Sequence, residues 1–463
     1  MPLKKYMPEW DDARMTERSD MAKRQDHVPV VPLGALCVAF WSIGLLGFGG
    51  PAAQIALMHR IVVDEKRWLS EARFMHALNY CMLLPGPEAQ QLATYIGWLN
   101  AGIRGGLIAG LLFVLPGLAV MIGLSAAYAV YHDIAWVAGL FFGLKAAVLA
   151  IVLQALLRIG TRALKTTFHR LVAVFAFLAL FCLALPFPVV VLLAALAGLI
   201  RASGQAVSKP QPAIEELPLN WWHIALSFLG WIGLWLAPLA VLALFDGGGR
   251  LTEIFLFFAR MALVTFGGAY AVLAYVAQVA VEHYQWLRPG EMVDGLALAE
   301  TTPGPLVLVL SFVGFLAAFR DADSVMPLIS GMAGALLTAW ATFVPSFVFI
   351  FAGAPLIERL RGNRLADGAL SAITAAVVGV IGNLAVWFGL HVLFAKVDRI
   401  PFSTLWPGER APGLWWPDLA SLDIPSLFLF AASALLLMRL KISMVIVLGL
   451  AAVAGLLWNL EAV

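Results

Sequence analysis

Phe48-Gly49-Gly50, Trp68 and Pro85-Gly86-Pro87 recur in the same order as Phe266-Gly267-Gly268, Trp286 and Pro303-Gly304-Pro305. The offset between each landmark and its copy is 218 in every case (48 to 266, 68 to 286 and 85 to 303). A constant offset inside an otherwise apolar chain indicates two homologous halves. Because Gly weakens a helix and Pro removes a backbone donor, we expect both halves to break their helices at these motifs, as many secondary transporters do.

The composition is that of an integral membrane protein. Of 463 residues, 62% are hydrophobic and 13% are charged, and the mean hydropathy is +0.90. Apolar runs of about 20 residues fit helices that span a lipid bilayer, whereas a barrel would show short alternating strands. We therefore expect an all-α polytopic membrane protein. The net charge of +2 does not indicate a nucleic-acid partner, and the three isolated Cys residues do not indicate a metal site, so no cofactor is expected.

The chain divides into five segments. We predict a polar cytoplasmic tail (1–30), a first repeat (31–200), a linker (201–220), a connecting transmembrane helix (221–245) and a second repeat (250–463). The tail lacks the hydrophobic region of a signal peptide, so cleavage is not expected. The connecting helix has no counterpart in the first half, and one extra crossing would invert the second half. The halves are therefore predicted to be inverted-topology repeats.

Loop charges support inversion, because Lys and Arg favour the cytoplasmic side. The loop between the two breaks of the first half carries Arg60, Lys66, Arg67 and Arg73, whereas its counterpart, 278–292, has only Arg288. A later pair of matching loops shows the opposite distribution of basic residues. Residues 131–133 of the first half have no Lys or Arg, and the matching loop of the second half has Arg359, Arg361 and Arg364. The amino terminus is then cytoplasmic. The basic residues Lys396, Arg399 and Arg410 fit this scheme less well, since it places their loop outside.

The doubled motifs resemble a known family. Phe48-Gly49-Gly50-Pro51, Pro85-Gly86-Pro87, Gln90 and Pro116-Gly117, together with the second copies, are similar to the chromate ion transporter family in its long, two-domain form. The resemblance covers nearly the whole chain. It implies export of chromate across the cytoplasmic (inner) membrane, driven by the proton motive force, and hence chromate resistance. Sulfate, which has the same shape and charge, is expected to compete.

The broken helices themselves can bind an oxyanion. Helix N-termini present unpaired N–H groups and partial positive charge, so two inward-pointing breaks can replace the hydration of a dianion without a metal. The backbone candidates are Gly49, Gly50, Pro51, Pro85, Gly86, Pro87, Gly267, Gly268, Pro303, Gly304 and Pro305. The alternative is that these motifs are only packing kinks, which are common in membrane helices.

Polar side chains near the breaks are further candidates for substrate binding. They are Gln54, His59, Asn79 and Gln90 in the first half and Thr301 and Thr302 in the second. The positions that match Gln54, His59 and Gln90 are occupied by Val272, Ala277 and Leu308. The two halves are therefore not equivalent, and we expect the first half to dominate substrate contact.

Three charged residues are candidates for coupling and charge compensation. Glu88 and Glu300 are carboxylates beside the breaks and are candidate proton carriers, because a carboxylate at membrane depth is costly. The alternative for Glu88 is a helix N-terminal cap. Lys145 lies inside an apolar run and can neutralise the dianion, or it can extend its ammonium group toward the membrane surface.

Other functions remain open at this stage. An uptake carrier for sulfate or another tetrahedral oxyanion would share the architecture. An intramembrane enzyme is a weaker alternative, since no nucleophile–base pair or metal-ligand cluster is evident in the sequence. The transport direction, the coupling ion and a homodimeric assembly are not decided by the sequence.

Overall fold

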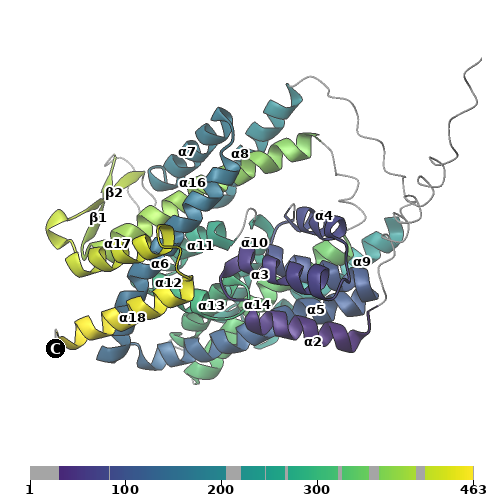
Figure 1. The fold of residues 1–463 in the computed structure, drawn as a ribbon, viewed down its shortest axis with the longest axis horizontal. Helices are drawn as coiled ribbons and strands as arrows, with labels where there is room; N and C mark the ends of the chain where they lie inside the picture. Colours follow the sequence, from purple (N-terminus) through teal and green to yellow (C-terminus); the bar gives the residue numbers. More distant parts are fainter. Residues whose placement is uncertain are drawn as a thin grey trace, which may run out of the picture.

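The computed structural model describes residues 31–82, 84–204, 221–245, 247–265, 269–321, 326–353, 364–402 and 412–461. This part of the chain is mostly helical, which confirms the predicted helical class (Figure 1). One small exception is the antiparallel pair β1 (Val397–Pro401) and β2 (Gly413–Pro417). The predicted tail, most of the linker, and the candidates Gly267 and Gly268 lie outside the described residues.

The first half runs from α2 to α8. Its elements are α2 (Leu33–Leu46), α3 (Gly50–His59), the π-helix η1 (Arg60–Glu65), α4 (Glu71–Cys81), α5 (Glu88–Tyr131), α6 (Ala135–Ala163), α7 (Thr167–Phe181) and α8 (Phe187–Ser203). The long α5 consists of two helices, because Ala101 and Gly102 have non-helical backbone angles. The helix ends flank both motifs, since α2 ends at Leu46 and α5 begins at Glu88.

The second half follows α9 (Trp221–Phe245). Its elements are α10 (Arg250–Val264), α11 (Ala269–Gln278), the π-helix η2 (Val279–His283), α12 (Pro289–Thr301), the 3₁₀ turn η3 (Leu306–Leu308), α13 (Val309–Phe319), α14 (Pro327–Phe351), α16 (Arg364–Leu393), the 3₁₀ turn η4 (Leu419–Ser421), α17 (Ile424–Met438) and α18 (Met444–Glu461). The order of helices parallels the first half, with α13 and α14 in the place of the two helices of α5.

Backbone details repeat at the same offset as the sequence motifs. Arg67 and Gln285 both adopt left-handed angles (φ 54° and 53°) after a π-helix. The next residue closes each turn in the same way: the Trp68 N–H donates to the Val62 carbonyl at 2.8 Å, and the Trp286 N–H donates to the Ala280 carbonyl at 2.8 Å. Non-Gly residues avoid positive φ, so the shared strain supports a common origin for the two halves.

The halves exchange their long helices. Helix α6 of the first half packs on α17 and α18 of the second, and α16 of the second half packs on α7 and α8 of the first (Figure 1). Helices α6 and α16 also contact each other. The two halves therefore share one helical body and do not form separate bundles.

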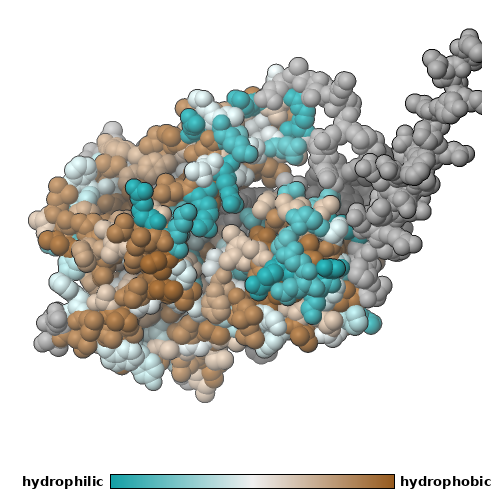
Figure 2. All heavy atoms as spheres, viewed as in Figure 1, coloured by the Kyte–Doolittle hydropathy of each residue, from teal (hydrophilic) through white to brown (hydrophobic). Residues whose placement is uncertain are grey.

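The exposed surface fits a lipid environment. Within the described residues, five helices are long and apolar enough to cross a membrane: α5, α6, α14, α16 and residues 225–244 of α9. Large apolar side chains such as Ile200 (72% exposed) and Leu244 (80% exposed) point outward. Figure 2 shows apolar residues over most of one face, with hydrophilic patches between them. Water does not tolerate so much apolar surface, so the protein is a multi-pass membrane protein.

Small residues allow the exchanged helices to approach closely. Where α6 meets α18, a Cβ atom added to Gly143 would overlap the Ala451 carbonyl oxygen, and one added to Gly455 would lie 2.7 Å from the Gly143 Cα atom. Such contacts leave no room for a methyl group. Close backbone packing between small residues is a principal source of helix association in membranes.

We predict that Gly455→Ala destabilises the protein by about 1–3 kcal/mol through overpacking. Gly449→Ala is the matched control on the same helix, because nothing lies within 4 Å of its added methyl group. The control should be neutral or stabilising, since Ala favours a helix over Gly by up to about 1 kcal/mol. Thermal unfolding in detergent measures both variants. Equal midpoints for the two would contradict the packing at this contact.

Candidate functional site

The first break separates α2 from α3. Gly49 and Gly50 adopt positive φ angles of 90° and 75°, which L side chains rarely accept, and Pro51 occupies the first turn of α3. Gly47 is buried, whereas Gly49 is exposed. The Gly-Gly pair thus ends one helix and starts another within the membrane protein.

The Pro-Gly-Pro motifs form the second break of each half. Gly86 (φ 118°) lies between α4 and α5, and Gly304 (φ 93°) lies between α12 and η3. Gly86, Pro87, Gly304 and Pro305 are buried, and Pro85 and Pro303 are half-buried. The N–H groups of the first turn after each break have no partner inside their own helix.

The breaks of the two halves are interlocked. The Gly86 N–H donates to the Thr265 carbonyl at 2.8 Å, and the Gly304 N–H donates to the Gly47 carbonyl at 3.2 Å. The two donors are related by the constant offset of the sequence motifs, and so are the two acceptors (86 to 304 and 47 to 265). Each Pro-Gly-Pro turn is therefore tied to the end of the first helix of the other half.

A Pro-containing span of the opposite half lies against each turn. A Cβ atom on Gly117, which follows Pro116 in α5, would lie 3.1 Å from the Gly304 Cα atom. A Cβ atom on Gly86 would lie 3.5 Å from Oγ of Ser346, which follows Pro345 in α14. Both turns are thus enclosed by helices from both halves.

Gln54 makes the two Pro-Gly-Pro turns unequal. Its Nε2 atom donates to the Gly47 carbonyl at 3.0 Å and to the Gly304 carbonyl at 2.5 Å, and the side chain is fully buried. Both amide protons are therefore used by the backbone, and in this conformation neither is free for an anion. Val272, the matching residue of the second half, cannot make such bonds.

Unpartnered polar groups gather at the first Pro-Gly-Pro turn. Gln90, in the first turn of α5, is fully buried, and neither of its amide atoms has a hydrogen-bond partner among the described residues. The same is true of the Ser346 hydroxyl, which is 1% exposed. Gln91 donates to the Pro85 carbonyl at 2.7 Å and holds the turn. Buried polar groups are nearly always satisfied, so unpartnered ones indicate a place for a polar ligand or water.

The other predicted polar side chains have partners elsewhere or face outward. His59 contacts the carboxylates of Glu71 at 2.5 Å and Asp64 at 3.5 Å. Asn79 is exposed on α4. The hydroxyls of Thr301 and Thr302 donate to carbonyls of their own helix, including Leu298 at 2.9 Å and Ala299 at 3.1 Å. No hydrogen bond joins any of these four side chains to Gln90, whose amide atoms have no partner among the described residues.

The two predicted coupling acids lie beside the breaks. Glu88 is the first residue of α5 and is half-buried, and Glu300 is 2% exposed and accepts a hydrogen bond from the Tyr270 hydroxyl at 2.7 Å. No ion pair joins either acid to another residue in the described ranges. A buried carboxylate without a cation is costly in a membrane and favours binding of a proton.

Lys145 has a partner that sequence reasoning missed. Its Nζ atom lies 3.3 Å from Oδ2 of Asp294 on α12, and the Tyr128 hydroxyl donates to the same oxygen at 2.8 Å. Asp294 is a single acid in an otherwise apolar turn of α12, and that was the available sequence signal. Its contacts come from the other half of the chain and could not be read from spacing.

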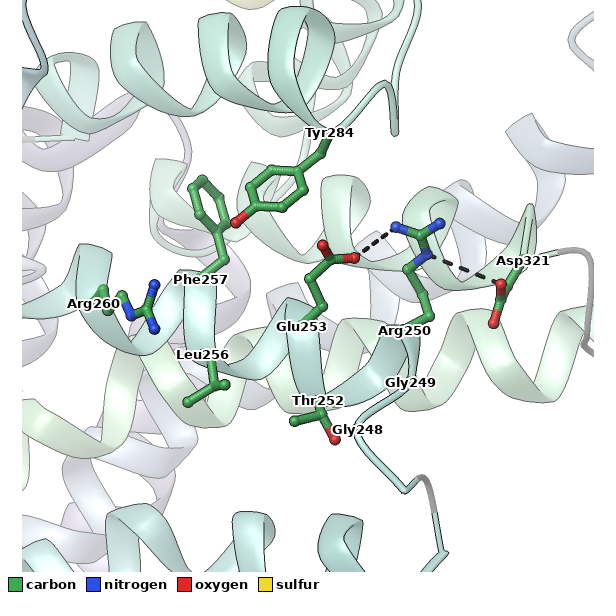
Figure 3. A pocket seen from close by; sticks show the side chains of 10 residues that line it. All are labelled: Gly248, Gly249, Arg250, Thr252, Glu253, Leu256, Phe257, Arg260, Tyr284 and Asp321. Atoms are coloured by element: carbon green, nitrogen blue, oxygen red, sulfur yellow. Dashed lines mark hydrogen bonds and ion pairs between the residues drawn. The ribbon is translucent and has the colours of Figure 1, made fainter.

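A cavity of about 690 Å³ lies along one face of α10 (Figure 3). At one end Arg250 pairs with Glu253 at 2.7 Å and with Asp321 at 4.0 Å. Phe257 and Tyr284 lie in the middle, and Arg260 lies at the other end. Helix α10 ends at Val264, directly before the Thr265 carbonyl that accepts the Gly86 N–H, so the cavity lies along a helix that leads into the interlock.

Comparison with known proteins identifies the family. The sequence pattern described as "Chromate transporter" matches residues 34–199 and 252–456, which is most of the chain. The chain belongs to the chromate transporter family. The two matched stretches fall on the two halves, and α9 lies between them.

Curated relatives match the chain over most of their length. The chain is 31% identical to the chromate transport protein of Pseudomonas aeruginosa, over 83% of this chain and 87% of the relative. It is 30% identical to a probable chromate transport protein of Synechococcus elongatus (79% and 87%) and 25% identical to an uncharacterized transporter of Methanocaldococcus jannaschii (82% and 89%). No solved structure matches the chain.

We predict that Gln54→Val, which introduces the residue type found at position 272, removes one hydrogen bond from each of two buried carbonyls. The Gly304 carbonyl loses its side-chain donor, and the Gly47 carbonyl keeps only the Gly304 N–H. The expected loss is about 1–3 kcal/mol in the free energy of unfolding. Gln154→Val is the control, because Gln154 is only partly buried and donates to one carbonyl, that of Leu437, at 3.3 Å. Thermal unfolding should show the larger loss for Gln54→Val. Similar losses in both variants would contradict a special role for the interlock.

Proposed function

We propose that the protein is a secondary transporter that exports chromate across the cytoplasmic (inner) membrane, uses the proton motive force and confers chromate resistance. The observation that carries this proposal is the pair of interlocked breaks with unpartnered donors beside them, in a chain of the chromate transporter family. Relatives that cover most of the chain are named for chromate transport.

The binding site in this proposal is made mainly of backbone. The first-turn N–H groups of α5 and the amide of Gln90 face a tetrahedral dianion, with the Ser346 hydroxyl as an added donor. Gly86 permits close approach because it has no side chain, and the helix N-terminus supplies partial positive charge. Sulfate matches chromate in charge and shape, so it competes at such a site.

Alternating access follows from the two halves if they are inverted repeats. The reciprocal bonds between equivalent positions of the two halves support a two-fold relation between the breaks. The basic segment from Arg60 to Arg73 then lies on the cytoplasmic side together with the amino terminus. Breaking one reciprocal bond while keeping the other opens the site to one side at a time.

Proton coupling in this proposal uses Glu88 and Glu300. Both lie next to a break, and neither has a cation partner in the described part of the chain. Protonation of either acid changes the local charge at the anion site by one unit. Such a change alters the affinity for a dianion, which is the thermodynamic requirement for coupling.

Gln90→Leu separates binding from stability. Leu308 occupies the matching position of the second half, so the apolar side chain is compatible with this type of turn. We predict an unchanged or raised thermal midpoint, because a buried unpartnered amide is lost, and a rise of at least about tenfold in the KM for chromate. Gln154→Leu should leave the KM unchanged. An unaltered KM in Gln90→Leu would remove Gln90 from the site.

Chromate flux in everted membrane vesicles tests the function directly. We predict accumulation in energised vesicles, loss of accumulation after uncoupling, and inhibition by excess sulfate. Glu300→Gln keeps an acceptor for Tyr270 but cannot take up a proton, so it should exchange chromate without accumulating it. Uptake of sulfate into right-side-out vesicles, without accumulation of chromate in everted ones, would replace the exporter by an oxyanion importer.

A further inference from the structure

Three helices bring polar groups together at Asp294, away from the breaks. Tyr128 comes from α5, Lys145 from α6 and Asp294 from α12, so both halves contribute. The hydroxyl of Tyr128 and the ammonium of Lys145 both contact Oδ2, at 2.8 Å and 3.3 Å. The other oxygen, Oδ1, is buried and has no partner among the described residues. One carboxylate oxygen is thus fully used and the other is unpartnered.

The members of the cluster lie at different distances from the ends of their helices. Lys145 is ten residues into α6, about 15 Å along the helix, whereas Tyr128 is three residues before the end of α5 and Asp294 is five residues after the start of α12. The ammonium group of Lys145 contacts Asp294. Asp294 precedes Pro303 by nine residues, or about 13 Å of helix, so the cluster is separate from the site at the breaks.

A neighbouring ion pair shows the contrast. Glu291, one turn earlier on α12, binds the Arg320 guanidinium through both oxygens at 2.7 Å and accepts the Arg288 N–H at 2.8 Å. Both carboxylate oxygens of Glu291 therefore have hydrogen-bond donors, and its negative charge is paired with Arg320. Asp294 has one flexible cation and an unpartnered oxygen, so its charge state can change without breaking a bidentate pair.

The charged surroundings of Asp294 are few. Lys145 and Tyr128 contact it directly, Glu291 is neutralised by Arg320, and His132 stacks on the Tyr128 ring at 5.2 Å between centroids. Helices α16 and α18 also pack on α12, but they make no ion pair with it in the described ranges. Lys145 is therefore the cation that balances Asp294.

Lys145 is accessible, whereas Asp294 is not. The side chain of Lys145 is 30% exposed and that of Asp294 is 4% exposed. Gly290 leaves space beside the ammonium group, since a Cβ atom there would lie 3.0 Å from Nζ. An anion can therefore reach Lys145 from the open side while Asp294 stays buried behind it.

We propose that Lys145 and Asp294 form a second oxyanion station that binds the anion together with a proton. The proton adds to Oδ1 of Asp294, while Tyr128 continues to donate to Oδ2. The neutral carboxyl group releases the Lys145 ammonium, which then pairs with the dianion. When the proton leaves, Lys145 returns to Asp294 and the anion is expelled. This station rests on the proposed function, because it requires that the protein carries an oxyanion.

Proton uptake on chromate binding tests the station. Purified protein in weak buffer with a pH indicator is titrated with chromate, well above the pKa of hydrogen chromate. The wild type should take up protons, with up to about one per protein from the station. Asp294→Asn should bind chromate at the breaks with the uptake lowered by this amount, the remainder coming from Glu88 and Glu300, and Asp294→Glu should restore it. Undiminished uptake in Asp294→Asn would overturn the station.

Matched double variants protect the test against misfolding. Lys145→Met with Asp294→Asn removes both charges together and keeps an acceptor for Tyr128, and it should lower proton uptake by the same amount as Asp294→Asn. Glu291→Gln with Arg320→Gln removes the neighbouring pair in the same way and should leave uptake intact. An equal loss of proton uptake in both double variants would show that removal of either ion pair has the same effect. That result would overturn the proposal.

The two proposals fail in different ways. Wild-type protein that binds chromate without proton uptake would overturn the station and the coupling role of Glu88 and Glu300, and leave an oxyanion carrier. Gln90→Leu should weaken binding at the breaks and still show proton uptake at higher chromate concentrations. Wild-type protein that binds no chromate would overturn both the carrier and the station.

Discussion

The structure depends on two backbone hydrogen bonds that cross between the halves, from Gly86 to Thr265 and from Gly304 to Gly47. Each bond satisfies a donor in a turn that has left its helix, which a membrane interior requires. Because each half supplies both a turn and an acceptor, neither half can complete its own break. The long helices are exchanged in the same way, since α6 packs on helices of the second half and α16 packs on helices of the first.

The interlock also explains why the two Pro-Gly-Pro turns differ in their free hydrogen-bonding groups. At the second Pro-Gly-Pro turn, Gln54 donates to the Gly304 carbonyl and Gly117 packs on the turn, and only Oε1 of Gln54, an acceptor, is unpartnered there among the groups named. At the first Pro-Gly-Pro turn, both amide atoms of Gln90 and the hydroxyl of Ser346 have no partner among the described residues. Both turns hold the halves together, and the first also offers donors to a ligand. This division supports the proposal that the first half dominates substrate contact.

The sequence predicted the helical class and the positions where helices end, because Gly and Pro act locally. Helix α2 ends at Leu46 and α5 begins at Glu88, beside the two motifs. The break at Ala101 and Gly102 falls between two apolar runs of the sequence, 74–99 and 105–130. The strands β1 and β2 were not predicted, and they lie in the loop that carries Lys396, Arg399 and Arg410.

The site was harder to predict, because its contacts join distant parts of the chain. Gln90 was singled out from its place after Pro-Gly-Pro, whereas Ser346, which lies in the other half of the chain, carries no local signal. Gln54 was expected to donate to an anion, but its amide protons are held by Gly47 and Gly304. Asp294 was overlooked, since only the packed structure shows that it balances Lys145.

The position of bound chromate is the most direct measurement, and anomalous scattering from chromium in crystals of the protein would provide it. If the interlocked breaks bind the oxyanion, the strongest chromium peak lies at the first turn of α5, within hydrogen-bond distance of the Gln90 amide. A chromium peak confined to the cavity along α10, with Gln90 still unpartnered, would contradict an oxyanion site at the breaks.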